Sequence, residues 1–177
     1  MLISPQHRAR YRAYYAARPS VPPVIPAWLP LLAALVVEVG ATSVLDYGCG
    51  PAAALSHAAS FPVRNYDPGE LAYARTPGLA DVVVCTHTLE HVEPACLADV
   101  LAHLWDCAWL AAFVLVQCDI STKVLPDGTP WHTCVHPPDW WAERLATLPE
   151  ARIVVLSAPG VARPGREFLC VLYRGGL

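Results

Sequence analysis

Short apolar runs alternate with segments of helical periodicity along most of the chain. Almost wholly apolar runs are typical of strands buried on both faces of a parallel sheet, and apolar positions three or four apart are typical of amphipathic helices. The predicted strands cover residues 42–48, 61–67, 81–86, 110–118, 152–158 and 166–174. The predicted helices cover residues 4–17, 28–39, 52–60, 93–108 and 139–148. This alternation, closed by a hairpin-like strand pair, predicts an α/β fold with a mostly parallel sheet and an antiparallel edge strand.

Length and composition agree with a single domain. The chain has 177 residues, of which 55% are hydrophobic and only 15% charged, so a large core under a lightly charged surface is expected and a disordered or fibrous chain is excluded. We expect one domain over residues 1–177. Residues 1–40 would form a helical cap and a proline-rich connector (19–26), and residues 41–177 a Rossmann-like core.

Net charge and cysteine content limit the binding partners and the cellular compartment that we expect. A net charge of −3 gives no global attraction to nucleic acid, although Arg8, Arg10, Arg12 and Arg18 lie in a stretch without acids. Those arginines could meet a phosphate or nucleotide, or simply form a solvated helix face. The longest apolar runs, 31–37 and 108–116, are far shorter than the ~20 residues of a membrane span. With seven cysteines and no C-x-x-C pair, reduced thiols and a cytoplasmic location are expected.

The strongest motif is a glycine-bearing turn between the first strand and the next helix. Asp46 closes the strand, and Gly48 and Gly50 follow it, which lets the backbone approach a ligand at a helix start. The second strand ends at Asp67, 21 residues after Asp46. An acid at about this distance is placed to accept hydrogen bonds from a ribose diol.

These residues, with a second motif, resemble class I S-adenosylmethionine-dependent methyltransferases. The family pattern V-L-D-x-G-x-G matches residues 44–50, and D-V-V-x-x-x-x-x-L-E-H-V matches residues 81–92. The resemblance implies a Rossmann-like three-layer sandwich with S-adenosylmethionine as cofactor. It also implies that Asp67 holds the ribose hydroxyls and that Thr86 and His87 border the methyl group. The remaining cofactor residues that it implies, on the methionine and ribose side, are Asp46, Gly48 and Gly50.

Two departures from the family pattern leave alternatives open. Ala52 replaces the third glycine of the loop and Pro51 stiffens the turn. Only thirteen residues separate Asp67 from the strand at 81–86, so one strand of the family is expected to be missing or vestigial. An NAD-binding Rossmann domain is disfavoured, because the glycine spacing is lost and the length allows no second substrate domain.

A cluster of histidines predicts a metal site. If the chain turns helical after residue 86, His87, Glu90 and His91 share one face, and His132 and His136 lie in the long loop 119–138 at the same sheet edge. Imidazoles with one carboxylate suit a divalent zinc, iron, manganese or cobalt ion. The arrangement is similar to metal-dependent small-RNA 2′-O-methyltransferases and ubiquinone-pathway O-methyltransferases. That resemblance implies the ligands His87, Glu90, His91 and His132.

Without a metal, the same residues have other roles. Glu90 and His91 would buttress the loop, and His87 or His132 would be the catalytic general base near neutral pH. A substrate lid is predicted over residues 125–132 and 136–141. The sequence of these segments resembles that of a group of small phage-encoded methyltransferases. Trp131 could stack on a base or sugar, and the N-terminal tyrosines could cap the cofactor or pack the helix.

The sequence therefore predicts transfer of a methyl group from S-adenosylmethionine to a small polar acceptor, such as a nucleotide or sugar hydroxyl, with or without a metal. DNA base methylation is disfavoured, since neither D-P-P-Y nor a P-C motif follows the strand at 81–86. Two alternatives remain: a metal-dependent hydrolase or lyase on the same fold, and a degenerate methyltransferase that serves as a binding subunit.

Overall fold

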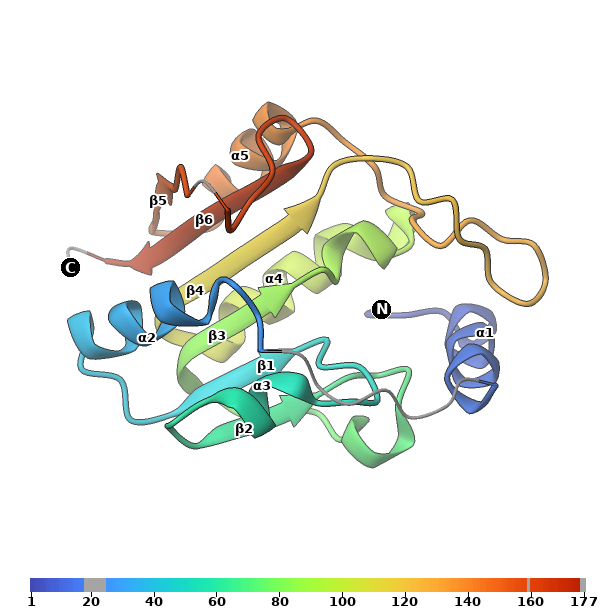
Figure 1. The fold of residues 1–177 in the computed structure, drawn as a ribbon, viewed down its shortest axis with the longest axis horizontal. Coiled ribbons are helices and arrows are strands. Elements are labelled where there is room, and N and C mark those ends of the chain that lie inside the picture. Colours follow the sequence, from blue (N-terminus) through green and yellow to red (C-terminus); the bar gives the residue numbers. More distant parts are fainter. Residues whose placement is uncertain (18–24, 159, 176–177) are drawn as a thin grey trace.

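A six-stranded sheet forms the centre of the computed structural model, which describes residues 1–17, 25–158 and 160–175 (Figure 1). The strand order is β2-β1-β3-β4-β6-β5. The strands are β1 (Val44–Tyr47), β2 (Val63–Tyr66), β3 (Ala80–Thr86), β4 (Ala108–Gln117), β5 (Ala151–Val155) and β6 (Glu167–Arg174). The first four pair in parallel, whereas β6 runs against both β4 and β5. This confirms the predicted α/β class, with a mostly parallel sheet and an antiparallel edge.

Helices cover both faces of the sheet, which gives the predicted three layers. The α-helices are α1 (Pro5–Ala16), α2 (Leu29–Glu38), α3 (Ala54–Ala58), α4 (Leu97–Cys107) and α5 (Pro138–Ala146). Successive residues of a strand point to opposite faces, so Val83 and Cys85 pack with α4 and α5, while Val82 and Val84 pack with α2 and α3. Because both faces are buried, β3 and β4 are apolar at nearly every position.

The segment after β2 contains the predicted departure from the family fold. Between β2 and β3 the structure has only a 3-10 helix, η1 (Leu71–Tyr73), and β2 is the edge strand of the sheet. The strand that the resemblance suggests beyond this edge is therefore replaced by a short turn. This confirms that thirteen residues are too few for a helix and a strand.

Element bounds differ from the sequence-based expectation at several ends. The helix predicted over 52–60 is limited to α3, because Ala53 takes a left-handed conformation (φ 42°) before it. The helix predicted from residue 93 begins as a separate 3-10 turn, η3 (Pro94–Cys96), before α4. Most of the proline-rich connector lies outside the described residues, as does Arg18. In the described part of the chain, no helix has the length and apolarity needed to cross a membrane, and all seven cysteines are free.

Helix α1 is separated from the other helices and lies beyond the carboxyl ends of the parallel strands, next to the loop that follows β4 (Figure 1). Ser4 caps it by accepting a hydrogen bond from the His7 amide (3.1 Å). The Ser4 hydroxyl and amide also donate to the Glu93 carboxylate (2.7 and 2.8 Å). The cap therefore attaches α1 to Glu93, in the segment between β3 and α4, over the predicted site.

Candidate active site

The Asp67 carboxylate is held in place by two backbone amides next to the glycine turn. Gly50 N–H donates to Oδ2 (3.0 Å) and Gly69 N–H donates to Oδ1 (2.7 Å). Asp67 is buried, and its burial raises the pKa of the carboxyl group against the lowering effect of these amides. Each oxygen keeps a further lone pair, so Asp67 is preoriented to accept hydrogen bonds from a diol.

The glycine turn brings the end of β1 against the segment after β3. Gly48 has φ +86°, and a Cβ there would lie 2.3 Å from both Oγ1 and Cγ2 of Thr88. The Thr88 hydroxyl donates to the carbonyl of Thr86 (3.1 Å). Thr88 therefore lines the pocket beside Gly48, whereas Thr86, the residue predicted there, contributes its carbonyl to this contact.

This packing leads to a prediction about stability. Replacing Gly48 by alanine should lower the free energy of unfolding by about 3 kcal/mol, because it combines a positive φ with overpacking against Thr88. Urea denaturation measures the change. Gly50→Ala is the matched control, since Gly50 also has a positive φ (+61°) but open space around it, and about 1 kcal/mol is expected. Equal losses in the two variants would contradict the role given to Thr88.

Asp46, at the end of β1, is buried next to Asp67. Its burial, together with the charge of Asp67, raises the pKa of Asp46 to about 7. Between about pH 4 and pH 7 the unfolded chain releases this proton while the folded chain retains it. The free energy of unfolding therefore falls as the pH rises through this range, by up to about 4 kcal/mol.

The variant Asp46→Asn removes this titration. We expect it to gain stability relative to the unmodified chain as the pH rises from 5 to 7, and the gain to level off above pH 8. Urea denaturation of both proteins without ligand, at pH 5, 6, 7 and 8, measures the difference. A difference that stays constant over this range would contradict the raised pKa of Asp46.

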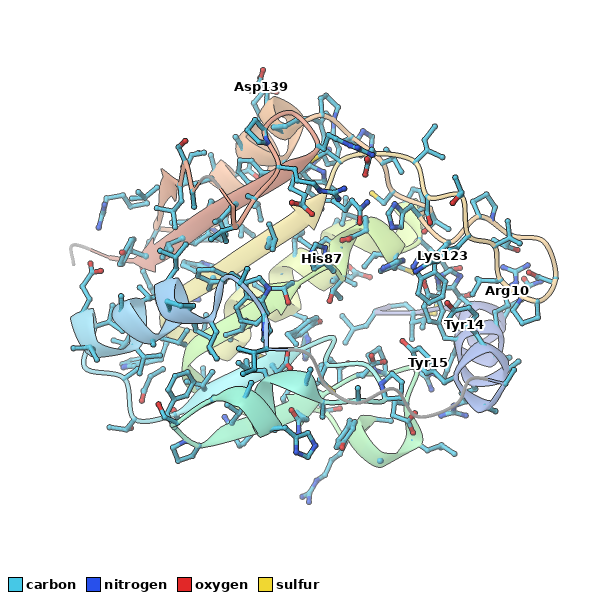
Figure 2. The ribbon with its side chains drawn as sticks, viewed as in Figure 1. Arg10, Tyr14, Tyr15, His87, Lys123 and Asp139 are labelled. Carbon is cyan, nitrogen blue, oxygen red and sulfur yellow. The ribbon has the colours of Figure 1, made fainter. Side chains whose placement is uncertain are left out.

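The pocket in front of the glycine turn is partly closed by α1. Its wall combines Gly48, Asp67 and Thr88 from the sheet edge with Tyr11 and Tyr15 from α1. The volume is about 90 Å³, well below the roughly 300–1,000 Å³ of typical ligand pockets. A cofactor-sized ligand therefore needs more room than this pocket offers, and α1 is one of the elements that close it. Figure 2 shows Tyr14 and Tyr15 on α1 at this end of the sheet.

Three of the predicted metal ligands come together in one cluster. Ligand atoms of Glu90, His91 and His132 all lie within 4.8 Å of one another. The Glu90 side chain is fully buried, and among the described residues neither of its oxygens has a hydrogen-bond partner. A buried carboxylate without such partners is costly, so the cluster has the character of a site prepared for a cation.

Backbone carbonyls orient both imidazole rings of this cluster. Nδ1 of His91 donates to the carbonyl of Trp131 (2.8 Å), and Nδ1 of His132 donates to the carbonyl of Asp119 (2.7 Å). Because a carbonyl only accepts, each ring carries its proton on Nδ1 and keeps the Nε2 lone pair for a ligand. Burial lowers the pKa of His91, which also favours the neutral ring that a metal needs.

Backbone hydrogen bonds explain how His132 reaches residues 42 positions away from it. The amides of Thr133 and Cys134 donate to the carbonyl of Glu90 (2.9 and 3.0 Å). The Thr133 hydroxyl contacts the carbonyls of His91 and Val92 (3.0 and 2.9 Å). The long loop is thereby fixed to the 3-10 turn η2 (Leu89–His91) that carries two of the ligands.

His87 lies beside this cluster, outside the set of three ligands. The expected helical turn over residues 87–91 is wrong, because His87 adopts φ +50° and the 3-10 turn begins only at Leu89. Its Nδ1 lies 3.5 Å from Oε1 of Glu90, and the ring is partly exposed at the end of β3 (Figure 2). Burial lowers the pKa of His87, but the neighbouring Glu90 carboxylate outweighs it and the net shift is upward. His136 is elsewhere, stacked on Trp140 at 3.7 Å between ring centroids.

A second, polar pocket of about 410 Å³ opens on the other side of His87 and His91. The two pockets share these histidines. The wall of the second pocket is formed by residues after β3, after β4 and before β6: His87, Glu90, His91, Gln117, Asp119, Ile120, Ser121, Thr122, Lys123, Trp131, His132 and Arg166. A donor in the first pocket and an acceptor in the second would thus meet at His87 and His91.

Sequence reasoning did not assign a role to several of these residues. Gly69 follows the Asp67-Pro68 step, a turn signal that could have indicated its contact with Asp67. Asp119 orients His132 through its backbone carbonyl, and His7 contacts the carbonyl of His91 (3.0 Å). Backbone contacts across such distances leave no pattern in a single sequence.

Comparisons with known proteins locate the fold. No protein-family model matches the sequence, and no curated protein matches it either. Solved structures do match. One is 1,6-didemethyltoxoflavin-N1-methyltransferase of Burkholderia thailandensis with bound S-adenosylhomocysteine: 16% identity, 99% of this chain and 92% of that one, TM-score 0.60.

A second match is DhpI in complex with S-adenosylhomocysteine: 18% identity, 97% of this chain and 95% of that one, TM-score 0.58. A third is the methyltransferase domain of bacterial CtHen1-C: 14% identity, 84% of this chain and 97% of that one, TM-score 0.60. The chain spans only 50–58% of three longer methyltransferase structures. At these identities the likeness concerns the fold, and the chain therefore has the fold of class I S-adenosylmethionine-dependent methyltransferases.

Proposed function

We propose that the protein transfers a methyl group from S-adenosylmethionine to a hydroxyl of a small polar acceptor, with a nucleotide or sugar hydroxyl among the candidates. The observation that carries this proposal is the Asp67 carboxylate, buried at the end of β2 and oriented by the amides of Gly50 and Gly69. Structural neighbours with bound S-adenosylhomocysteine support the choice of cofactor. The narrower resemblance to small phage-encoded methyltransferases stays a prediction.

The first pocket and the glycine turn beside it fit the cofactor, with Asp46 and Gly50 next to the pocket wall rather than in it. Asp67 would accept hydrogen bonds from the two ribose hydroxyls, and Gly48 and Gly50 leave the backbone accessible to the ligand. Asp46, with its pKa near neutrality, would meet the cationic methionine part of the cofactor and gain its charge there. Tyr11 and Tyr15 would close over the cofactor from α1.

The second part of the proposal is assistance by a divalent cation held by Glu90, His91 and His132, with His87 at the edge of the set. Two imidazole Nε2 atoms and one carboxylate are a donor set that zinc, iron, manganese and cobalt accept. A cation there lowers the pKa of an acceptor hydroxyl, which makes the oxygen a better nucleophile toward the methyl group.

His87 is the proposed general base. It lines both pockets, is partly exposed, and has an upward-shifted pKa from the neighbouring Glu90 carboxylate. From this position His87 can take the hydroxyl proton as the oxygen attacks the methyl group. His132 would orient the acceptor and, without a metal, share the role of base.

A second candidate function is supported by the same cluster. Glu90, His91 and His132 all line the second pocket, which a metal-dependent hydrolase or lyase would use without the cofactor. Elemental analysis that finds stoichiometric metal, combined with no binding of cofactor, would favour it over the main proposal.

Isothermal titration calorimetry of the purified protein with S-adenosylhomocysteine tests the proposed function. Binding with a stoichiometry of one is expected. No heat signal at millimolar ligand, from protein shown to be folded by circular dichroism, would overturn methyl transfer as the function.

A further inference from the structure

The two carboxylates of the polar pocket beside the histidine cluster, Asp119 and Glu90, match its two cationic side chains, Arg166 and Lys123. A cation bound by the cluster would therefore make the lining positive. The carboxylate of Asp119 is already engaged, because Arg166 and the Gln117 amide donate to it, and its pKa is lowered accordingly. Glu90 lies at the buried end of the pocket. Lys123, the chain's only lysine, lies on the wall, and among the described residues no carboxylate pairs with its ammonium group.

The backbone holds Lys123 in the wall of the same pocket as the histidine cluster. Its amide donates a hydrogen bond to the Ser121 hydroxyl oxygen (3.1 Å), and its carbonyl accepts a hydrogen bond from the Trp131 amide (3.0 Å). The next residue, Val124, bridges Pro130. Lys123 is thus tied to the residue that precedes His132, and Figure 2 shows it where the long loop meets α1.

With a divalent cation on Glu90, His91 and His132, the lining of the pocket has an excess positive charge. The charges of Arg166 and Asp119 cancel, and Glu90 offsets one of the two charges of the cation. One positive charge of the cation and that of Lys123 remain. The pocket, of about 410 Å³, has a size suited to a small molecule. Lys123 is exposed and water screens its charge, so a neutral acceptor would gain nothing from it. An acceptor with its own negative charge would neutralise it.

We infer that the acceptor is a small hydroxylated anion, whose hydroxyl faces the Glu90–His91–His132 cluster and whose carboxylate or phosphate is bound by Lys123. This rests on the proposed function and specifies its acceptor. A point charge on a flexible stem suits either kind of anion, and the free N–H groups of Arg166 add hydrogen-bond donors at the same wall.

Saturation-transfer-difference NMR tests this assignment with three probes that share hydroxyl groups: glycerol, glycerate and glycerol 3-phosphate. The unmodified full chain is saturated with S-adenosylhomocysteine and measured with and without Zn²⁺. We expect at least a threefold larger signal for the two anions than for glycerol. The comparison between glycerate and glycerol 3-phosphate shows which anionic group the pocket prefers.

Variants connect the effect to the lysine. Lys123→Met should remove the preference for the anions, Lys123→Arg should retain it, and Arg75→Met, the same loss of charge at an exposed arginine elsewhere, should leave it unchanged. Equal signals for all three probes, including none from any, would overturn the inference, and so would a preference that persists in Lys123→Met.

The outcome also distinguishes a macromolecular acceptor. A signal from a short single-stranded RNA that exceeds those of both small anions would overturn the small-molecule assignment in favour of RNA. Failure of the inference is separable from failure of the proposed function, because calorimetry with S-adenosylhomocysteine reports on the first pocket alone. If S-adenosylhomocysteine binds but the anions give no larger signal than glycerol, the proposed methyl transfer is retained and the anionic acceptor is rejected.

Discussion

The variant Asp67→Asn should bind S-adenosylhomocysteine about 100-fold more weakly than the unmodified protein. The change removes the charge and one of the two acceptors that face the ribose diol, a loss of about 3 kcal/mol. It also turns an amide N–H₂ toward one of the two backbone donors, Gly50 or Gly69. Isothermal titration calorimetry measures the dissociation constant.

Asp106→Asn, an equal change on an exposed residue of α4, is the matched control for this experiment. Thermal unfolding without ligand shows whether Asp67→Asn is still folded. An affinity within threefold of the unmodified protein, in a folded variant, would remove Asp67 from the cofactor site. It would then favour the alternative of a degenerate methyltransferase-like subunit, which has no need of this carboxylate.

The second large effect is expected at Glu90, and it should have opposite signs with and without metal. Without metal, Glu90→Gln removes a buried charge whose oxygens lack hydrogen-bond partners among the described residues and face only the partly exposed His87 ring at 3.5 Å, so the variant should unfold at a higher temperature. With Zn²⁺ or Mn²⁺ in excess, the unmodified protein should gain stability through binding, and the variant should gain little.

Differential scanning calorimetry with chelator and with metal measures both halves of this prediction. Glu143→Gln, on the exposed side of α5, is the control that should change neither. A metal-dependent stabilisation of the same size in Glu90→Gln and in the unmodified protein would contradict a metal site at Glu90, His91 and His132. The proposal of metal assistance would then fall, while binding of the cofactor would stay open.

Much of the fold could be predicted because burial leaves a local pattern. The apolar residues of β3 and β4 follow from a sheet covered on both faces, and the spacing from Asp46 to Asp67 follows from one strand–helix–strand unit. The replacement of a strand by η1 follows from chain length alone. In each case a few neighbouring residues contain the information.

The site was less predictable, because its geometry depends on contacts between distant segments. His87 was expected on the same helical face as Glu90 and His91, but its left-handed backbone places it before the 3-10 turn. The position of His132 depends on the Thr133 and Cys134 amides, which bind a carbonyl more than 40 residues away. Lys123 carries no motif at all, and only the folded loop shows that it lines the same pocket as the cluster.

Helix α1 has a consequence for the order of events in a catalytic cycle. Trp131 packs against Tyr14 (4.1 Å between ring centroids) and His91 (4.7 Å), so α1 supports one wall of the polar pocket while it covers the other pocket. For the proposed function, outward movement of α1 to admit the cofactor would loosen that wall, and the acceptor site would be complete only after α1 had returned. The proposed methyl transfer would then follow a compulsory sequence, with the cofactor binding first and its demethylated product leaving last. That product should compete kinetically with the cofactor alone.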